Sequence, residues 1–260
     1  MRTYSFISIQ GNVGKSSIVY NFSRYLASKD YKVLIIDMDH QCSISRVFKC
    51  DEKINTVKGI FTNEKVKIKN VSENIDLIEG SYDLDSVEYQ MINQPNSDTL
   101  LLRWLSTNMN KNLKLSSKYD VILIDTNTGF ESSTRNSIAV SDIVINVDVP
   151  ISDSKRFKDI TLKQFKECVV EISDSISTKS YVKPKYYVVG NVVNLVFEDS
   201  RLYIEELKES DDYLTYFIEK NSFSIEKYQN NSNTKEDSDL FKPYSCLLYT
   251  SDAADDLLCV

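Results

Sequence analysis

The stretch Ile9–Ser17 reads "IQGNVGKSS". It stands at the end of a run of alternating hydrophobic residues, and this run predicts a β-strand. Within it, Gly11, Asn12 and Gly14 are residue types that tolerate a positive φ angle. Such a backbone lets successive N–H groups point into one concavity, where they bind phosphate oxygens. The stretch therefore predicts a phosphate-binding loop between a strand and a helix, and this loop decides the fold.

Two side chains after the glycines complete this prediction. Lys15 is placed to reach the β- and γ-phosphates of a nucleotide, and Ser16 to offer its hydroxyl to Mg²⁺. The N-terminus of the following helix adds its dipole. The strict loop pattern asks for glycine five residues before Gly14, where Ile9 stands. On this stretch alone, a strand-to-helix turn with a solvated lysine therefore stays open.

Segments with strand-like and helix-like patterns alternate along the chain. Six hydrophobic runs predict strands: "YSFISI" (4–9), "KVLIID" (32–37), "NIDLIE" (74–79), "YDVILID" (119–125), "DIVINVDV" (142–149) and "KYYVVGNVVN" (185–194). Helical spacing predicts a helix over 15–28 and another over 157–172. Continuously apolar strands are typical of a parallel sheet that is covered on both faces. We therefore expect an α/β fold with a doubly wound, mostly parallel sheet flanked by helices.

Acidic residues stand where two of these strands end. Asp37 and Asp39 are two residues apart, so both side chains point to the same side of an extended segment, and Asp125 follows four apolar residues. A buried acid is costly unless it is paired or holds an ion, which makes Asp125 the candidate to hold Mg²⁺ through water. Taken singly, each acid could also be a helix N-cap or turn residue. These two strand ends and the strand end that leads into the phosphate-binding loop together favour one nucleotide site, because ligands collect at the carboxyl ends of parallel strands.

Composition restricts the class of protein without naming a function. The chain has 260 residues, 42% hydrophobic and 27% charged, with a net charge of −7, which fits one soluble globular domain and argues weakly against a wholly basic nucleic-acid surface. No apolar run reaches the roughly 18 residues that a membrane span needs, so no stable membrane insertion is expected. The N-terminus enters a strand pattern without a signal sequence, which predicts a cytoplasmic location.

The last stretch, "CLLYTSDAADDLLCV" (246–260), differs from the rest of the chain. It has no turn residues leading into it and no clear period, and it resembles the translation of a sequencing-library adapter. A native short helix is the alternative. We expect 246–260 to be a non-native tail, and 1–245 to be a single domain that is truncated at its C-terminus.

Three motifs now indicate a family. The stretches "QGNVGKSS" (10–17), "VLIIDMDHQCSIS" (33–45) and "YDVILIDTNTG" (119–129) resemble the deviant Walker A, D-x-D-P-Q and Walker B motifs of the ParA/MinD ATPases, which are P-loop NTPases of the SIMIBI type. The similarity runs over about 4–194. The D-x-D-x-Q form favours ParA-type partition proteins over MinD-type proteins and over tyrosine kinases of related fold.

The resemblance implies roles for individual residues. Lys15 and Asp39 would be catalytic, since Lys15 grips phosphate and Asp39 orients or activates the attacking water. Ser16 and Asp125 would hold Mg²⁺, and Asn194 would contact the adenine, although Asn191 lies only three residues away. The whole nucleotide-binding set that the resemblance implies is Gly11, Asn12, Val13, Gly14, Lys15, Ser16, Ser17 and Asn194.

The chain departs from the family pattern at several positions. Gln10 stands where the family has its signature lysine, which reaches the partner's phosphates in the ATP-bound dimer. A neutral amide makes hydrogen bonds about half as strong as charge-assisted ones, so we expect slow hydrolysis unless another cation substitutes. Asn12 replaces a glycine, His40 replaces a proline, and Asn127 and Thr128 replace Pro-Pro.

The resemblance implies an ATPase that uses ATP and Mg²⁺, dimerises with itself and acts in plasmid or chromosome partitioning. Its expected partners are non-specific DNA and a ParB-like centromere-binding protein, which would place it on the nucleoid when it binds DNA. The basic residues of 155–166 are a candidate DNA-binding face, or simply a solvated one. The alternatives are a MinD-like membrane-associated positioning ATPase and an ATP-binding regulator whose hydrolysis is weak because of Gln10.

Overall fold

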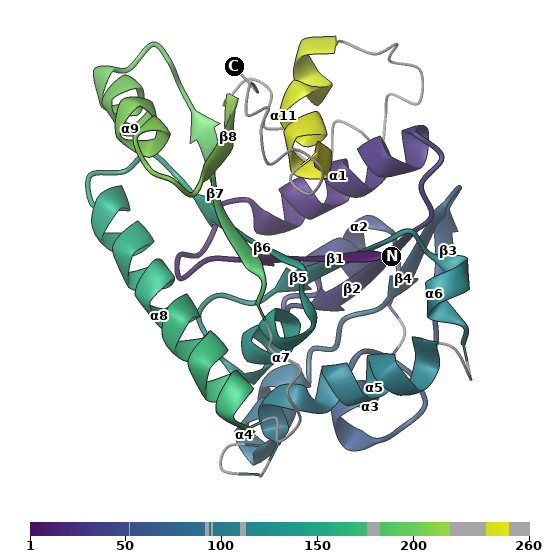
Figure 1. Cartoon of the computed structure of the whole chain (residues 1–260). Coiled ribbons are helices and arrows are strands. Elements are labelled where there is room, and N and C mark those ends of the chain that lie inside the picture. Colours follow the sequence, from purple (N-terminus) through teal and green to yellow (C-terminus); the bar gives the residue numbers. More distant parts are fainter. Residues whose placement is uncertain are drawn as a thin grey trace.

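The computed structural model describes residues 1–51, 53–91, 94, 96–109, 113–175, 183–218 and 238–249. Within them an eight-stranded sheet has the order β3-β4-β2-β5-β1-β6-β7-β8 (Figure 1). All neighbours are parallel except β3 and β4, which are antiparallel. The strands are β1 (Arg2–Ile7), β2 (Val33–Met38), β3 (Lys69–Ser72), β4 (Ile75–Ile78), β5 (Val121–Thr126), β6 (Ile143–Asp148), β7 (Lys185–Val193) and β8 (Tyr213–Ile218). The expected doubly wound, mostly parallel α/β fold is confirmed.

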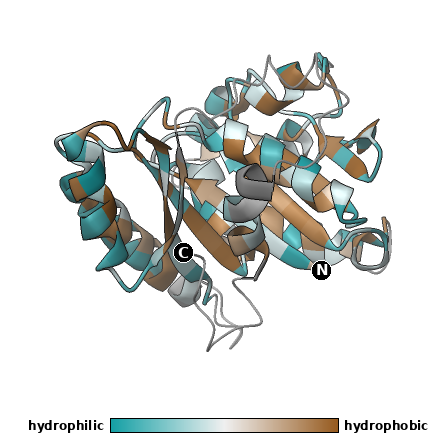
Figure 2. Cartoon of the chain, turned by 90° about the horizontal axis from the view of Figure 1, so that it is seen from above, coloured by the Kyte–Doolittle hydropathy of each residue, from teal (hydrophilic) through white to brown (hydrophobic). Residues whose placement is uncertain are grey.

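Helices cover both faces of this sheet (Figure 1). One face packs against α1 (Lys15–Ser28), α2 (Ser43–Val47) and α11 (Ser238–Tyr249). The other face packs against the remaining helices, which are α3 (Lys58–Thr62), α4 (Leu84–Met91), α5 (Leu100–Met109), α6 (Leu115–Lys118), α7 (Ser132–Val140), α8 (Ser154–Ser175) and α9 (Glu198–Lys208). Figure 2 shows the strands largely in the hydrophobic colour and the flanking helices in mixed colours.

The continuous hydrophobic runs explain this arrangement. All six residues of β2 are buried, and their side chains alternate between the two faces. Val33 and Ile35 join the core under α1, whereas Leu34 and Ile36 join the core under α3 and α5. Strands buried on both faces are the reason that the pattern is continuous rather than alternating.

The structure adds elements that the sequence patterns did not predict. β3 and β8 extend the sheet at its two edges. The helix α11 crosses the expected boundary at residue 245, and Cys246 and Leu247 are buried in the core cluster of α1. The range 250–260 lies outside the described residues, so the non-native character of the tail stays a prediction.

Candidate functional site

The carboxyl ends of the parallel strands bring the predicted motifs to one edge of the sheet. β1 leads into the loop of 8–14, β2 ends beside Asp37 and Asp39, and β5 ends beside Asp125. β2 and β5 are neighbours, and their register places Asp37 directly opposite Asp125. The two acidic motifs and the loop therefore converge because of the sheet topology.

The loop after β1 has the backbone that its residue types predict. Asn12 has φ 59° and Gly14 has φ 87°. Gly14 precedes α1, whose first turn closes when the Ile18 N–H donates to the Gly14 carbonyl at 3.0 Å. The Ser8 hydroxyl accepts a hydrogen bond from the Gln10 N–H at 3.0 Å. Gly11 and Asn12 are exposed, so the loop presents backbone groups to solvent at the start of α1.

Lys15 lies at the start of α1 and is buried, with 7% of its surface exposed. Burial lowers the pKa of the Lys15 ammonium, while the charges of Asp125 and Asp39 raise it. Ser16 and Ser17 follow on the first turn and are half-buried. The structure thus brings Lys15, Asp39 and Asp125 within electrostatic range of one another, as the motifs predicted.

Asp125 is fully buried at the end of β5, and neither carboxylate oxygen accepts a well-formed hydrogen bond from the described residues. Burial raises the pKa of Asp125 well above its ordinary value, and the charge of Asp37 adds to this effect. The Ser16 hydroxyl and the Lys15 ammonium act in the opposite direction. A buried carboxylate with free oxygens is what a cation site requires.

The donors near Asp125 fit Mg²⁺ rather than a metal held only by protein groups. Among the described residues, no group of three or more His, Cys, Asp or Glu side chains could hold a metal ion. Mg²⁺ keeps several waters and binds through one or two protein oxygens together with substrate phosphates. Asp125 and the Ser16 hydroxyl supply such oxygens beside the loop.

Asp37 is buried as well, but one of its oxygens accepts two well-formed hydrogen bonds. One oxygen accepts hydrogen bonds from the Ser45 N–H at 2.9 Å and the Ser45 hydroxyl at 2.7 Å. The Ser45 oxygen in turn accepts from the Gly80 N–H at 2.9 Å, so this junction ties α2 to the end of β4. A Cβ atom at Gly80 would lie 3.0 Å from the Asp37 carboxyl, which explains the glycine. Burial raises the pKa of Asp37 to about 6.

Asp39 is the more accessible acid of the pair, since 14% of its side chain is exposed. Its carboxylate accepts a hydrogen bond from the Gln41 N–H at 2.8 Å, which fixes the turn into α2. The neighbouring His40 imidazole lies 3.0 Å from an Asp85 oxygen through Nδ1, although it is not aligned for a hydrogen bond.

The end of β7 supplies a contact that the motifs did not assign. The Asn191 amide donates to the Val13 carbonyl of the loop at 2.7 Å, and a Cβ atom at Gly14 would collide with this amide. The register of β7 with β8 shifts between Gly190 and Val193, and Val192 has φ 56°. Such a bulge re-aims a side chain, and a β-branched residue with positive φ is strained.

Asn194, the asparagine that the resemblance favoured, lies in the turn after β7. Its side-chain oxygen accepts a hydrogen bond from the Val196 N–H at 3.1 Å, and it is half-buried. Of the two asparagines, Asn191 is therefore the one that the structure brings to the loop. The motif spacing could not decide between them, because the bulge at Val192 changes which side chain points to the site.

Gln10 occupies the signature position at the entry of the loop. Its side-chain nitrogen is buried and has no hydrogen-bond partner among the described residues. The Gln10 N–H donates to the Ser8 hydroxyl, so the backbone of Gln10 is held in place while its side-chain nitrogen makes no hydrogen bond to the described residues.

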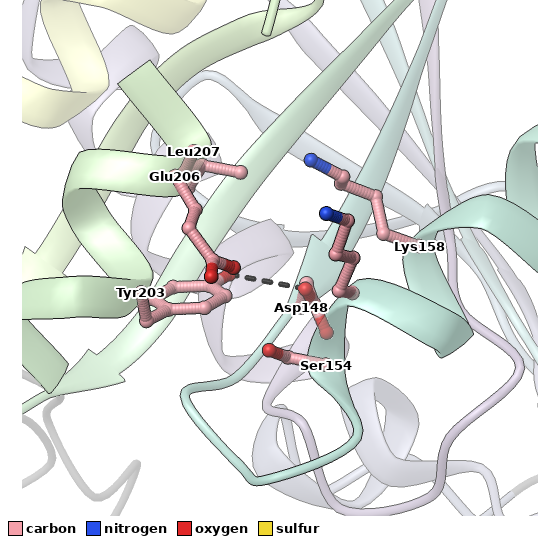
Figure 3. Close-up of a pocket in the computed structure, with 7 residues that line it drawn as sticks. Asp148, Ser154, Lys158, Tyr203, Glu206 and Leu207 are labelled. Carbon is pink, nitrogen blue, oxygen red and sulfur yellow. Dashed lines mark hydrogen bonds between the residues drawn. The ribbon is translucent and has the colours of Figure 1, made fainter. Parts of the chain in front are cut away.

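A hollow of about 170 Å³, including space open to solvent, lies between α8 and α9 at the same edge (Figure 3). Asp148, at the end of β6, accepts a hydrogen bond there from the Tyr203 hydroxyl at 3.1 Å. Burial raises the pKa of Asp148 to about 6. Tyr203 lies over Gly190, where a Cβ atom would meet its ring at 3.1 Å, so α9 is held against β7 just before Asn191.

The comparisons with known proteins agree with this geometry. A family model described as an AAA domain matches residues 1–182. The chain belongs to the ParA/MinD-type AAA family. The family assignment rests on well over half of the chain and covers the loop and both acidic motifs.

Individual relatives and solved structures are similar to this chain. A plasmid-partitioning protein ParA from Thermus thermophilus is 30% identical over 128 residues, which cover 48% of this chain and 37% of that protein. A plasmid partition protein from Borrelia burgdorferi B31 bound to AMPPNP has a TM-score of 0.71 at 24% identity and covers 95% and 96% of the two chains. Cobyrinic acid a,c-diamide synthase from Mycobacterium smegmatis, with an ATP analogue and magnesium, has a TM-score of 0.67 at 17% identity and covers 81% and 83%. The two structures show the shared fold.

The buried acids predict a pH dependence for the protein without nucleotide. Asp37 and Asp148 have pKa values raised from 3.8 to about 6, so between these values the native state binds more protons than the unfolded state. The free energy of unfolding should therefore fall as pH rises from about 4 to about 6, and the share of this loss that comes from Asp37 and Asp148 should be complete above that. Thermal unfolding across this range measures it.

Asp125→Asn should remove a buried carboxyl whose charged form is disfavoured by burial and by Asp37, and is only partly offset by Ser16 and Lys15. We expect its melting temperature without nucleotide to exceed that of the wild type by several degrees at about pH 7.5, since 1 kcal/mol corresponds to roughly 2–4 °C at this size. At about pH 4 the difference should shrink, because the wild-type carboxyl is then protonated. A variant that melts below the wild type at the higher pH would show that Asp125 is compensated.

Asn191 and Asn194 can be separated by substitution. Asn191→Ala leaves the Val13 carbonyl without its donor, so nucleotide affinity should fall about fivefold, the equivalent of one hydrogen bond of about 1 kcal/mol. Asn194→Ala should change it less than about twofold. Fluorescence titration with an ATP analogue measures both, and a larger loss for Asn194→Ala would return the adenine-contact role to that residue.

Proposed function

We propose that this chain binds Mg-ATP at the loop of 8–17, hydrolyses it slowly, and dimerises to act in plasmid or chromosome partitioning. The observation that carries this proposal is the pairing of a buried Lys15 with a fully buried Asp125 whose oxygens lack well-formed hydrogen bonds. A phosphate-bound magnesium ion resolves both features, because it brings negative phosphates to Lys15 and a cation to Asp125. Family membership and the AMPPNP-bound Borrelia structure support the same ligand.

The positions of the residues support the roles that we propose for them. The N–H groups of the loop and the Lys15 ammonium would bind the phosphates, with Ser17 beside the α-phosphate. Mg²⁺, when bound, neutralises phosphate charge that develops during transfer. Ser16 and Asp125 would hold it, the latter through water. Asp39, the most accessible of the three acids, would accept a hydrogen bond from the attacking water.

Gln10 supports slow turnover and leaves a second candidate function. Its buried amide has no partner within the described residues and carries no charge to offer a second subunit. A charged side chain that a partner supplies to a transferring phosphoryl group is worth about 10³–10⁵ in rate in other nucleotide hydrolases. The chain could therefore serve as an ATP-binding switch in which dimerisation, and not turnover, carries the signal.

The proposed partners are a second copy, non-specific DNA and a ParB-like centromere-binding protein, in the cytoplasm or on the nucleoid. Lys155, Arg156 and Lys166 are exposed on α8 and could contact DNA phosphates. Lys163 is paired with Glu167 at 3.8 Å, which reduces the basic face that the sequence predicted. No helix in the described part of the chain is long and apolar enough to cross a membrane.

Calorimetric titration with AMPPNP and Mg²⁺ tests the proposal. We expect binding in the micromolar range or tighter, and its loss by at least about a hundredfold in Lys15→Ala, since a buried charge-assisted contact is worth about 3 kcal/mol. Arg24→Ala, an exposed change on the same helix, is the control. Absence of heat with the wild type would refute the proposal.

Gln10→Lys restores the lysine of the family pattern. If Gln10 limits turnover, the variant should hydrolyse ATP at least about tenfold faster than the wild type, whereas affinity for AMPPNP by the monomer should change little. Phosphate release measured with and without DNA gives the rate. An unchanged rate would favour the switch function, in which the charge is not the missing element.

A further inference from the structure

The helix α4 lies between the two loops that carry the site acids. It begins at Leu84, just after the Gly80 junction with Ser45, and it packs against α3 and α7. Its buried side includes Glu88, of which 6% is exposed, while Tyr89 on its outer side is 78% exposed. A carboxylate on the buried side of a short helix needs partners, because burying a charge without them is costly.

Glu88 finds these partners in the segment that follows Asp125. One oxygen accepts the Ser133 N–H in the first turn of α7, and the other lies 3.5 Å from the Asn127 amide nitrogen that donates to it. Asn127 in turn accepts a hydrogen bond from the Thr134 hydroxyl at 3.0 Å. The residue before α7, Glu131, makes no side-chain capping hydrogen bond. Glu88 therefore caps α7 from another helix and holds the Asp125 loop in the same contact.

The same helix also reaches the loop that carries Asp39. Asp85, three residues before Glu88 and so on a neighbouring part of the helix surface, lies 3.0 Å from His40 Nδ1. The Ser45–Gly80 hydrogen bond fixes the start of the α4 segment to Asp37. One helix thus contacts both loops through its acidic side chains.

The contacting residues are departures from the family motifs. His40 and Asn127 stand where those motifs have proline, and proline has no side-chain donor. Two substitutions in separate motifs each provide a polar group to the same helix. This agreement between distant positions indicates that α4 has a defined role in positioning the two loops.

We propose that Glu88 is a positioning residue for Mg²⁺-dependent nucleotide binding, acting through Asn127 and α7 on the loop of Asp125. This inference rests on the proposed function. In this inference, nucleotide binding requires that the loop after β5 keep one conformation. In that conformation the Thr126 hydroxyl donates to the Phe6 carbonyl at 2.8 Å, and the Gly129 N–H donates to the Ser8 carbonyl at 2.9 Å. Without Glu88, the Asn127 amide and the α7 N-terminus lose their shared acceptor.

Glu88→Gln tests the inference with little change in shape. A glutamine amide offers one acceptor where two donors converge, so the loop should loosen. We expect the Mg²⁺ concentration for half-maximal binding of a fluorescent ATP analogue to rise about tenfold, which is typical of residues that orient metal ligands. Affinity for the analogue in EDTA should stay within about twofold, because Lys15 and the loop of 8–14 are untouched.

Glu131→Gln is the matched control, since it removes the same charge at the same helix start but breaks no capping contact. Asn127→Ala tests the contact from its other side and should raise the Mg²⁺ requirement in the same direction. In the double variant the two effects should be less than multiplicative. Thermal unfolding of every variant shows whether the fold is retained, and Asn127→Ala serves as the test if Glu88→Gln does not fold.

The outcomes separate this inference from the proposed function. A wild type that binds no nucleotide would overturn both. If the wild type binds but Glu88→Gln shifts the Mg²⁺ requirement no more than Glu131→Gln, the inference alone is wrong. It is equally wrong if Glu88→Gln weakens binding by the same factor with Mg²⁺ and with EDTA, because that result indicates a general structural effect.

Discussion

The burial of the Asp125 carboxylate at the sheet edge is the constraint on which the rest of the site depends. The carboxylate lies at the end of a strand that is buried on both faces, opposite Asp37 and close to Asp39, so three acids share a region in which Lys15 is the buried cation. Burial disfavours the charged forms of Asp37, Asp125 and Lys15, and their partners offset this effect only in part. Asp37 has Ser45 as a close donor, whereas neither oxygen of Asp125 accepts a well-formed hydrogen bond from the described residues. The fold therefore maintains an electrostatic imbalance that a phosphate-bound cation would relieve.

Holding such a site open requires rigid surroundings, and the structure supplies them from three directions. Ser8 connects the loop after β1 to the loop after β5, because its hydroxyl accepts the Gln10 N–H and its carbonyl accepts the Gly129 N–H. Asn191 fixes the Val13 carbonyl from β7. Glu88 fixes the start of α7. Each connection joins residues far apart in the sequence, so the site forms only when the whole sheet has assembled.

The sequence predicted those strands and helices in which the pattern of apolar residues reflects which side chains are buried. Six strands and the helix over 15–28 were predicted correctly because the spacing of their apolar residues matches the side chains that each element buries. β3, with the sequence "KNVS", was missed because a short polar edge strand has no apolar pattern. It pairs with β4 through the turn at Asn74. Glu88 was missed, and Asn191 was not separated from Asn194, for a different reason. An asparagine beside another, and an acid on a short helix, look like solvated residues until a bulge and a neighbouring helix position them.

The departures from the family pattern change the charge balance of the site in one direction. The pattern places two lysines in the loop, whereas this chain has Lys15 and the neutral Gln10, facing the same number of acids. Because the family's signature lysine reaches the partner's phosphates, each site of a dimer would receive one positive charge fewer. The divalent cation would then supply a larger share of the charge that compensates the phosphates and Asp125 there. A contact such as that of Glu88 with the Asp125 loop gains importance for the same reason, since a site that relies more on its cation relies more on the geometry of the groups that hold it.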